Sequence, residues 1–97
     1  MEQLKVSAKS SPKSVAGALA GSVQKHGHVE IKVIGAGALN QAVKALIIAR
    51  RFTTTFDGDD LICIPSFIDI EMDGDKKTGI SLLVKCQHNN GQLINEI

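Results

Sequence analysis

The spacing of apolar residues along the chain predicts four strands and two helices. Strands are recognised by apolar residues at every second position, and helices by apolar residues three or four apart. The expected strands cover residues 4–8, 29–34, 61–72 and 80–86, and the expected helices cover residues 12–26 and 38–51. The order is strand, helix, strand, helix, strand, strand. It predicts an α+β protein with two layers, in which two helices cover one face of a four-stranded mixed sheet.

The first predicted helix has clear end signals. Ser11 is a suitable N-cap, Pro12 fits the first helical position, and Gly27 is a typical C-terminal stop. Its core face is expected to carry Val15, Leu19 and Val23.

A second face of this helix is unusually smooth because it carries Gly17 and Gly21. A glycine inside a helix costs about 1 kcal/mol relative to alanine. The pair therefore predicts the close approach of another backbone. The favoured neighbour is the protein's own sheet, and the alternative is a partner chain.

The second predicted helix is broadly apolar. Its core stripe is expected to consist of Leu39, Ala42, Val43 and Leu46, flanked by Ala38, Ala45, Ile47 and Ala49. The side facing water is expected to carry Asn40, Gln41, Lys44 and Arg51. Ile48 falls among these polar residues, which predicts that it is exposed and takes part in a protein contact.

The third predicted strand starts with the apolar run Leu61–Pro65, which suits a strand covered on both faces. The pattern shifts after Pro65, which predicts a bulge there because proline cannot donate to the ladder. With Ile70 opposite Ile80, this bulge would place Cys63 opposite Cys86. Both cysteines are expected to be buried thiols, since their spacing and surroundings do not fit a zinc site.

Composition narrows the possible functions. The 97 residues fit one domain, expected over residues 1–86, followed by a polar tail over 87–97. Eleven basic and ten acidic residues give a net charge of +1, too little for non-specific coating of DNA, and three Phe without Trp or Tyr argue against stacking of single-stranded bases. The longest apolar run is far shorter than the roughly 18 residues of a membrane helix, and the N-terminus has no signal pattern. We therefore expect a cytoplasmic protein without membrane contact.

The stretch "VIGAGALNQAV" (Val33–Val43) runs from a strand through a glycine turn into a helix. A dinucleotide fingerprint needs a third glycine where Asn40 stands, and no phosphate-binding Gly-Lys-Ser or Gly-Lys-Thr is present. Two interpretations stay open. Gly35 and Gly37 either form a tight turn only, or expose helix amides that receive an anion such as a DNA phosphate.

No arrangement of a nucleophile with a base and an orienting group is recognisable, so an enzyme is not expected. We likewise expect no cofactor, no metal and no small-molecule substrate. Basic residues instead gather at two loop tips: Lys9 and Lys13 flank the first strand-to-helix loop, and Lys76 and Lys77 follow the final hairpin turn. Such lysines commonly serve solubility, but two projecting tips could also hold the phosphates of a duplex.

Three blocks of sequence resemble the stage V sporulation protein S family. They are "LKVSAKSSPKSVAGALAG", "IGAGALNQAVKALIIAR" and "DLICIPSFIDI", and the resemblance extends from Met1 to about Lys85. This family is similar in fold to the archaeal chromatin protein Alba and to the C-terminal domain of translation initiation factor three. The resemblance implies the same order of elements that the spacing predicts.

Alba-like proteins bind DNA or RNA as dimers through basic residues of the first loop, the turn before the second helix and the hairpin arms. The resemblance therefore implies nucleic-acid contacts at Lys9, Lys13, Lys76 and Lys77, together with Gly35, Gly37 and Asn40. The second turn departs from the family pattern. It offers backbone amides at Gly35, Ala36 and Gly37 where the archaeal proteins carry arginine or lysine.

Two functional hypotheses follow. The first is a non-enzymatic, nucleic-acid-binding regulator linked to sporulation, which contacts DNA or RNA phosphates as a homodimer. The alternative is an assembly module, a homodimer or higher oligomer with little affinity for nucleic acid. Its interface would use Gly17, Gly21 and Ile48. A dinucleotide-using enzyme is disfavoured by the incomplete fingerprint.

Overall fold

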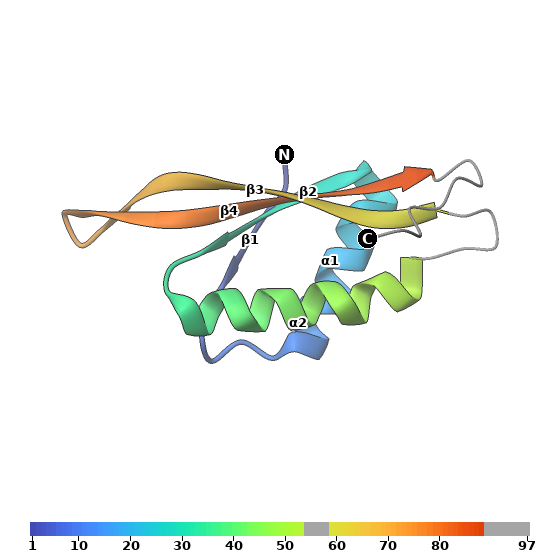
Figure 1. Ribbon diagram of the computed structural model, residues 1–97, viewed down its shortest axis with the longest axis horizontal. Helices are drawn as coiled ribbons and strands as arrows, with labels where there is room; N and C mark the ends of the chain where they lie inside the picture. Colours follow the sequence, from blue (N-terminus) through green and yellow to red (C-terminus); the bar gives the residue numbers. More distant parts are fainter. Residues whose placement is uncertain (54–58, 89–97) are drawn as a thin grey trace, which may run out of the picture.

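A computed structural model describes residues 1–53 and 59–88 of the protein. Its elements are β1 (Gln3–Val6), α1 (Pro12–His26), β2 (His28–Val33), α2 (Ala36–Thr53), β3 (Asp59–Met72) and β4 (Asp75–His88). The predicted order and the α+β class are therefore confirmed. Both helices lie on the same side of one four-stranded mixed sheet (Figure 1). The predicted polar tail begins inside β4, and residues 89–97 lie outside the described residues.

The sheet has the spatial order β1-β2-β4-β3. The two strands β1 and β2 are parallel, whereas β4 is antiparallel to both of its neighbours. The core lies between the sheet and the helices, and its largest fully buried side chains are Leu19, Val29, Ile31, Val33 and Val84. This arrangement places β3 at an edge.

The ends of α1 are confirmed. The Ser11 side chain accepts a hydrogen bond from the Ser14 N–H at 3.4 Å, and Pro12 opens the helix. Gly27 adopts a φ of 83° and its N–H donates to the Val23 carbonyl oxygen at 2.8 Å. Helix α1 therefore ends at a left-handed residue, where glycine is favoured because it has no Cβ.

The predicted core stripe of α2 is partly wrong. Its buried face is made of small side chains, namely Ala38, Ala42, Ala45, Ala49 and Thr53. Small side chains let the helix approach both α1 and the sheet, so the larger residues lie at the margins of the contact. Leu39 and Leu46 are half-buried, and Val43, predicted in the core, is 42% exposed.

The structure contradicts the close packing of Gly17 and Gly21 on the protein's own sheet. Both glycines are exposed, and a Cβ added at either would meet no atom within 4 Å. The cause is the rotation of α1, which turns Ala16, Leu19 and Val23 toward the core. The alternative neighbour, a partner chain, stays a prediction.

The covering of β3 on both faces is also wrong, because β3 is an edge strand and its residues from Cys63 to Phe67 are exposed. No bulge interrupts it. Its pairing with β4 runs without a break from Asp59 opposite His88 to Met72 opposite Asp75. An edge strand can turn the missing donor of Pro65 away from its single neighbour, so the proline needs no bulge.

The uninterrupted pairing changes the predicted partners of both cysteines. Cys63 lies opposite Val84, and Cys86 lies opposite Leu61. Ile70 faces Lys77 instead of Ile80. Both thiols are free and exposed, so the prediction that they are buried is wrong. Partial burial still raises the pKa of each thiol, and the carboxylates of Asp59 and Asp60 raise that of Cys86 further.

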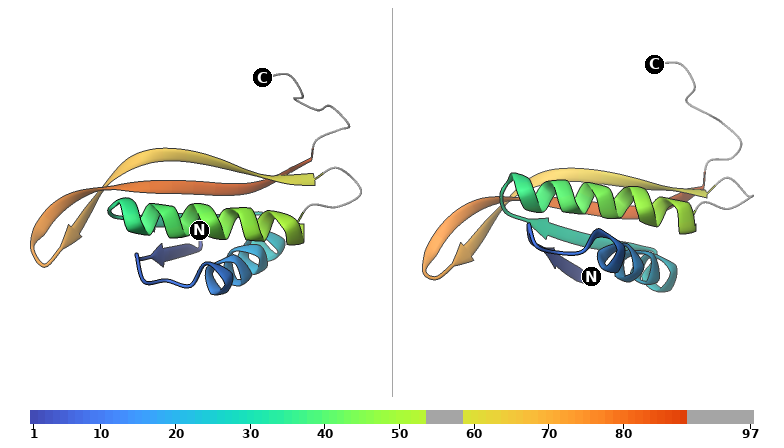
Figure 2. Two further views of the ribbon diagram at one scale, coloured as in Figure 1. Left: turned by 60° about the horizontal axis from the view of Figure 1, so that its bottom comes forward. Right: turned by 90° about the horizontal axis from the view of Figure 1, so that it is seen from below.

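The β3–β4 hairpin extends beyond the rest of the sheet. Pairing between β2 and β4 starts at Val33 opposite Ile80, so the preceding residues of β4 pair with β3 alone. We call residues 68–79 the hairpin arm; it curves away from the sheet plane (Figure 2). Its tip is a two-residue turn in which Asp73 and Gly74 have φ values of 53° and 82°. Positive φ at both central residues is the pattern of a type I′ turn.

Candidate nucleic-acid interface

Both helices start at the same end of the molecule. The parallel neighbours β1 and β2 end side by side, with Val6 opposite Val33, and each strand is followed by a short connection and then a helix. The hairpin arm leaves the sheet at this end as well (Figure 2). All the residues predicted to contact nucleic acid therefore lie on three neighbouring segments: the loop after β1 with the first turn of α1, the start of α2, and the arm.

The loop between β1 and α1 is held by its own serines. The Ser10 N–H donates to the Ser7 carbonyl oxygen at 3.1 Å, and the Ser7 N–H donates to the Ser10 hydroxyl at 2.9 Å. The Lys9 N–H donates to the Ser7 hydroxyl at 3.2 Å. Lys9 and Lys13 are exposed on either side of this turn. Lys9 is therefore presented from a hydrogen-bonded loop, and Lys13 from the first turn of α1.

The loop is attached to the start of α2. The Gln41 side-chain amide donates to the Ser10 carbonyl oxygen at 2.9 Å. Gly37 lies against Ala8 so closely that an added Cβ would be 2.9 Å from the Ala8 Cβ. The structure thus brings Lys9 and Gly37, 28 positions apart in the sequence, into one surface.

The glycine turn before α2 is confirmed at Gly35 only, because Gly37 has no positive φ and lies inside the helix. Gly35 adopts a φ of 87°, and its carbonyl oxygen accepts from the Leu39 N–H at 3.1 Å. No acidic residue lies in the first turn of α2 or of α1. The positive ends of both helix dipoles are therefore not neutralised locally, which favours an anion at this end. Asn40, one turn into α2, is exposed beside them.

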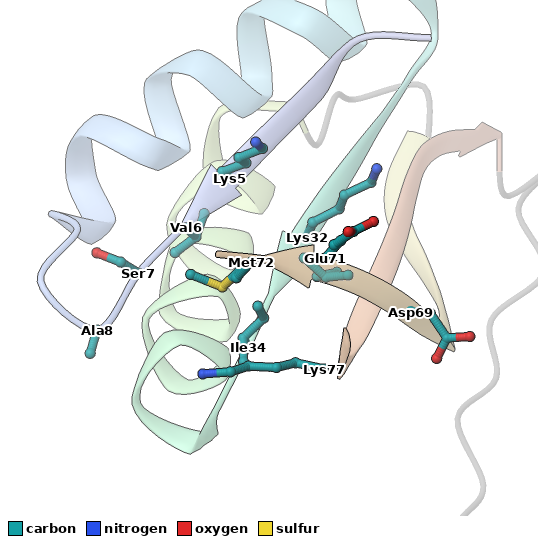
Figure 3. A pocket seen from close by; sticks show the side chains of 11 residues that line it. Lys5, Val6, Ser7, Ala8, Lys32, Ile34, Asp69, Glu71, Met72 and Lys77 are labelled. Carbon is teal, nitrogen blue, oxygen red and sulfur yellow. The ribbon is translucent and has the colours of Figure 1, made fainter. Parts of the chain in front are cut away.

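The hairpin arm is less favourable to a polyanion. Lys76 and Lys77 are exposed on β4, opposite Glu71 and Ile70. The arm carries four carboxylates, at Asp69, Glu71, Asp73 and Asp75, against these two amines, a formal charge of −2. The Lys77 side chain runs back past Ile34 toward the body of the molecule (Figure 3). The positive charge of the interface therefore lies mainly at the helix starts.

The structure revises the apolar contact predicted on α2. Ile48 is half-buried against the core, so its predicted exposure is wrong, and Ile47 is 55% exposed instead. Both isoleucines line a shallow groove of about 440 Å³ with Lys44 and residues 11–13 of α1's start. Gly17 and Gly21 lie farther along the exposed side of α1.

Sequence reasoning missed two lysines at this end. Lys5 on β1 lies directly opposite Lys32 on β2, on the sheet face that the helices do not cover. Both occupy polar positions of alternating strands, and this alternation alone could have indicated that they share the uncovered face of the sheet. Their pairing could not be predicted, because it depends on the register of two strands separated by a helix.

Other site types find no support in the part of the chain that the structure describes. Residues 1–53 and 59–88 hold no group of three or more His, Cys, Asp or Glu side chains that could bind a metal ion. Within the same residues, neither helix is long and apolar enough to cross a membrane.

Comparison with known families gives a match over nearly the whole chain. The family model described as Stage V sporulation protein S matches residues 2–87. The match includes the first loop, the glycine turn and the hairpin arm.

Proposed function

The chain belongs to the stage V sporulation protein S family, and from this premise we propose that it is a cytoplasmic, non-enzymatic regulator that binds nucleic acid during sporulation. It acts as a homodimer. The backbone phosphates of DNA or RNA are contacted by Lys9 and Lys13, by the free amides at the start of α2 from Gly35 to Ala38, and by the Asn40 side chain.

One observation carries this proposal. Because β1 and β2 are parallel, α1 and α2 both start at the same end of the molecule, beside Lys9 and Lys13. Neither helix has an acidic residue in its first turn. Helix amides and lysine amines both favour phosphate oxygens, and such contacts bind the backbone without reading the base sequence. Lys76 and Lys77 contribute less, because the carboxylates of the arm repel phosphate.

In the proposed dimer, the two chains contact one another through the side of the molecule at the β3 edge. We call Leu39, Val43 and Phe67 the β3 flank. Phe67 is 81% exposed and lies across a shallow pocket from Leu39, and Val43 follows Leu39 by one helical turn. An exposed apolar surface beside an open strand edge is a typical place for a second chain.

The test is fluorescence polarisation of a labelled short duplex, and of a matching RNA, at rising salt. We expect binding that weakens steeply with salt, because each phosphate contact releases counterions. Lys9→Glu with Lys13→Glu should abolish binding, and the milder Lys9→Gln with Lys13→Gln should reduce the salt slope by about 2.

The matched control is Lys25→Glu with Lys85→Glu. It changes the net charge equally but alters exposed residues at the end of α1 and in β4, away from the helix starts. Equal losses in the two Glu variants would show that only net charge matters. Unchanged binding by Lys9→Glu with Lys13→Glu would remove the proposed site.

The assembly module stays the second candidate, and the β3 flank is the observation that favours it. A protein with this function would form an oligomer that survives high salt and would not bind the duplex even at low salt, where phosphate contacts are strongest.

A further inference from the structure

The hairpin arm encloses a cleft against the ends of β1 and β2 (Figure 3). The cleft has a volume of about 570 Å³, which falls within the range of roughly 300–1,000 Å³ typical of small-molecule sites. The hairpin arm can curve over the strand ends because residue 79 is a glycine. A Cβ there would lie 2.6 Å from the Ile70 Cδ1 and 2.8 Å from the Val33 carbonyl oxygen.

The cleft lining carries three amines and two carboxylates, Asp69 and Glu71, so its formal charge is positive. Lys5 and Lys32 are directly opposite one another in neighbouring strands, and Lys77 reaches the cleft from the arm. Like charges on the same face of two neighbouring strands repel one another. Within the described part of the chain, none of the three amines forms an ion pair. An anion bound here would remove this repulsion.

The rest of the lining is mostly apolar, and its polar groups are the Ser7 hydroxyl and the carboxylates of Asp69 and Glu71. Ile34, Ile70 and Met72 line the cleft, and methionine is flexible and makes favourable contacts with aromatic rings. In Figure 3 the Glu71 side chain lies near Lys32, whereas Asp69 points away from the other labelled side chains. A carboxylate accepts hydrogen bonds, so Glu71 favours a ligand with an N–H group near its apolar part.

From this combination we propose that the cleft binds a nucleoside phosphate. The phosphate lies against Lys5 and Lys32, the base lies on Ile34 and Met72, and an amino group of the base donates to Glu71. A fatty acid would satisfy the amines and the apolar lining but has no donor for Glu71. The cleft borders the duplex surface at Ser7, Ala8 and Lys77, but the proposal does not rest on duplex binding, since the phosphate contacts it needs are Lys5 and Lys32.

The test is a titration of the ¹⁵N-labelled full chain with adenosine monophosphate, followed by NMR. We expect saturable shifts at the amides of Ser7, Ile34 and Met72. Adenosine and inorganic phosphate should each bind at least about tenfold more weakly, because each makes only half of the contacts. The absence of saturable shifts up to about 5 mM nucleotide, a concentration that detects even millimolar affinity, would overturn the proposal.

Single substitutions test whether the nucleotide binds in the cleft. Lys32→Gln should weaken nucleotide binding at least about tenfold, with Lys5→Gln as a second variant if the first one loses its dispersed native spectrum. The control Lys25→Gln, at the end of α1, should bind as the parent does. Equal binding by the parent, Lys32→Gln and Lys5→Gln would overturn the proposal.

The nucleotide has two sources, a free mononucleotide and the 5′-phosphorylated end of a strand. A 5′-phosphorylated dinucleotide that displaces adenosine monophosphate from the same amides would identify the strand end as a ligand, and failure to displace it would restrict the site to the free nucleotide. Both outcomes support the cleft.

Variants distinguish a loss of nucleotide binding in the cleft from a loss of duplex binding at the loop. Lys9→Glu with Lys13→Glu should abolish duplex binding and leave nucleotide binding unchanged. Nucleotide shifts that vanish in this variant and persist in Lys32→Gln would place the nucleotide at the loop and overturn the proposal.

Discussion

Gly37 in the first turn of α2 lies directly against Ala8 in the loop before α1, where an added Cβ would be 2.9 Å from the Ala8 Cβ. Together with the hydrogen bond from Gln41 to Ser10, this contact fixes the lysine-bearing loop to the start of α2. The glycine is therefore needed for the close approach of two segments.

Substitution of this glycine tests the contact. Gly37→Ala should lower the free energy of unfolding by about 1 kcal/mol, because overpacking costs about 1–3 kcal/mol and the gain in helix propensity returns at most about 1 kcal/mol. It should also weaken duplex binding, since the loop has to move. Urea unfolding and polarisation measure the two effects.

The matched control is Gly21→Ala in α1, where a Cβ would meet no atom within 4 Å. This change should raise the free energy of unfolding by about 0.5–1 kcal/mol. If Gly37→Ala stabilised the protein as much as Gly21→Ala does, the loop would not be held against α2.

The two thiols should react in the folded protein. Cys63 and Cys86 are exposed, so iodoacetamide should label both without denaturant. Their pKa values are raised by partial burial, and the thiolate is the reactive form. The labelling rate should therefore keep rising above the pH at which an unperturbed thiol is fully ionised. Mass spectrometry after timed labelling measures this, and labelling only after unfolding would contradict the structure.

Oxidation should not join the two cysteines within one chain. They are offset diagonally across β3 and β4, since Cys63 faces Val84 and Cys86 faces Leu61. Diagonal neighbours are about 7–8 Å apart, beyond the roughly 6.8 Å that a disulfide spans. Mild oxidation should therefore give cross-linked chains on a non-reducing gel, and an intrachain disulfide would show that the strand register is different.

The ion pair between α2 and β3 makes stability depend on pH. Arg50 donates to both carboxylate oxygens of Asp60, at 2.7 and 2.8 Å, and these hydrogen bonds lower the pKa of Asp60. A carboxyl group with a lowered pKa in the folded state stabilises the fold above its unfolded pKa of about 3.9. This contribution is lost as the pH falls through the unfolded value and then the folded one.

Asp60→Asn should therefore be less stable than the parent at pH 7, and the two proteins should become similar near pH 2. Urea unfolding at both pH values measures the difference. Asp69→Asn is the control, because Asp69 forms no ion pair within the described residues. A stability difference for Asp60→Asn that did not shrink in acid would contradict the assignment.

The β3 flank predicts how the protein self-associates. Phe67→Lys should shift the protein toward monomer in analytical ultracentrifugation at tens of micromolar, because the substitution places a charge in the apolar surface. Phe52→Lys, at the end of α2, alters another exposed phenylalanine and should leave the association unchanged. A parent protein that is monomeric at this concentration would exclude the homodimer.

Local signals allowed the order of elements to be predicted. Ser11, Pro12 and Gly27 fix the ends of α1 through their own backbone preferences, and alternation identifies the strands. The errors concern properties that depend on distant segments. The exposure of Cys63 follows from the position of β3 at the sheet edge, and the half-burial of Ile48 follows from which side of α2 packs against the core.

In the candidate site, too, local signals were predictable and contacts between distant segments were not. Lys9 and Lys13 could be identified from the loop alone, because a turn with cap signals exposes its charged residues. The opposition of Lys5 and Lys32 could not, since it requires both the parallel pairing of β1 with β2 and its register.

The sheet order β1-β2-β4-β3 also affects how the chain folds during synthesis. β4 follows β3 in the sequence but lies between β3 and β2, so β2 has only β1 as a neighbour until β4 has left the ribosome. The β3–β4 hairpin is local and can close quickly, whereas its docking on β2 brings together residues about 50 positions apart and should be the slower step. The nascent chain therefore exposes the unpaired edge of β2 until β4 docks, and a chaperone that shields strand edges would act in that interval.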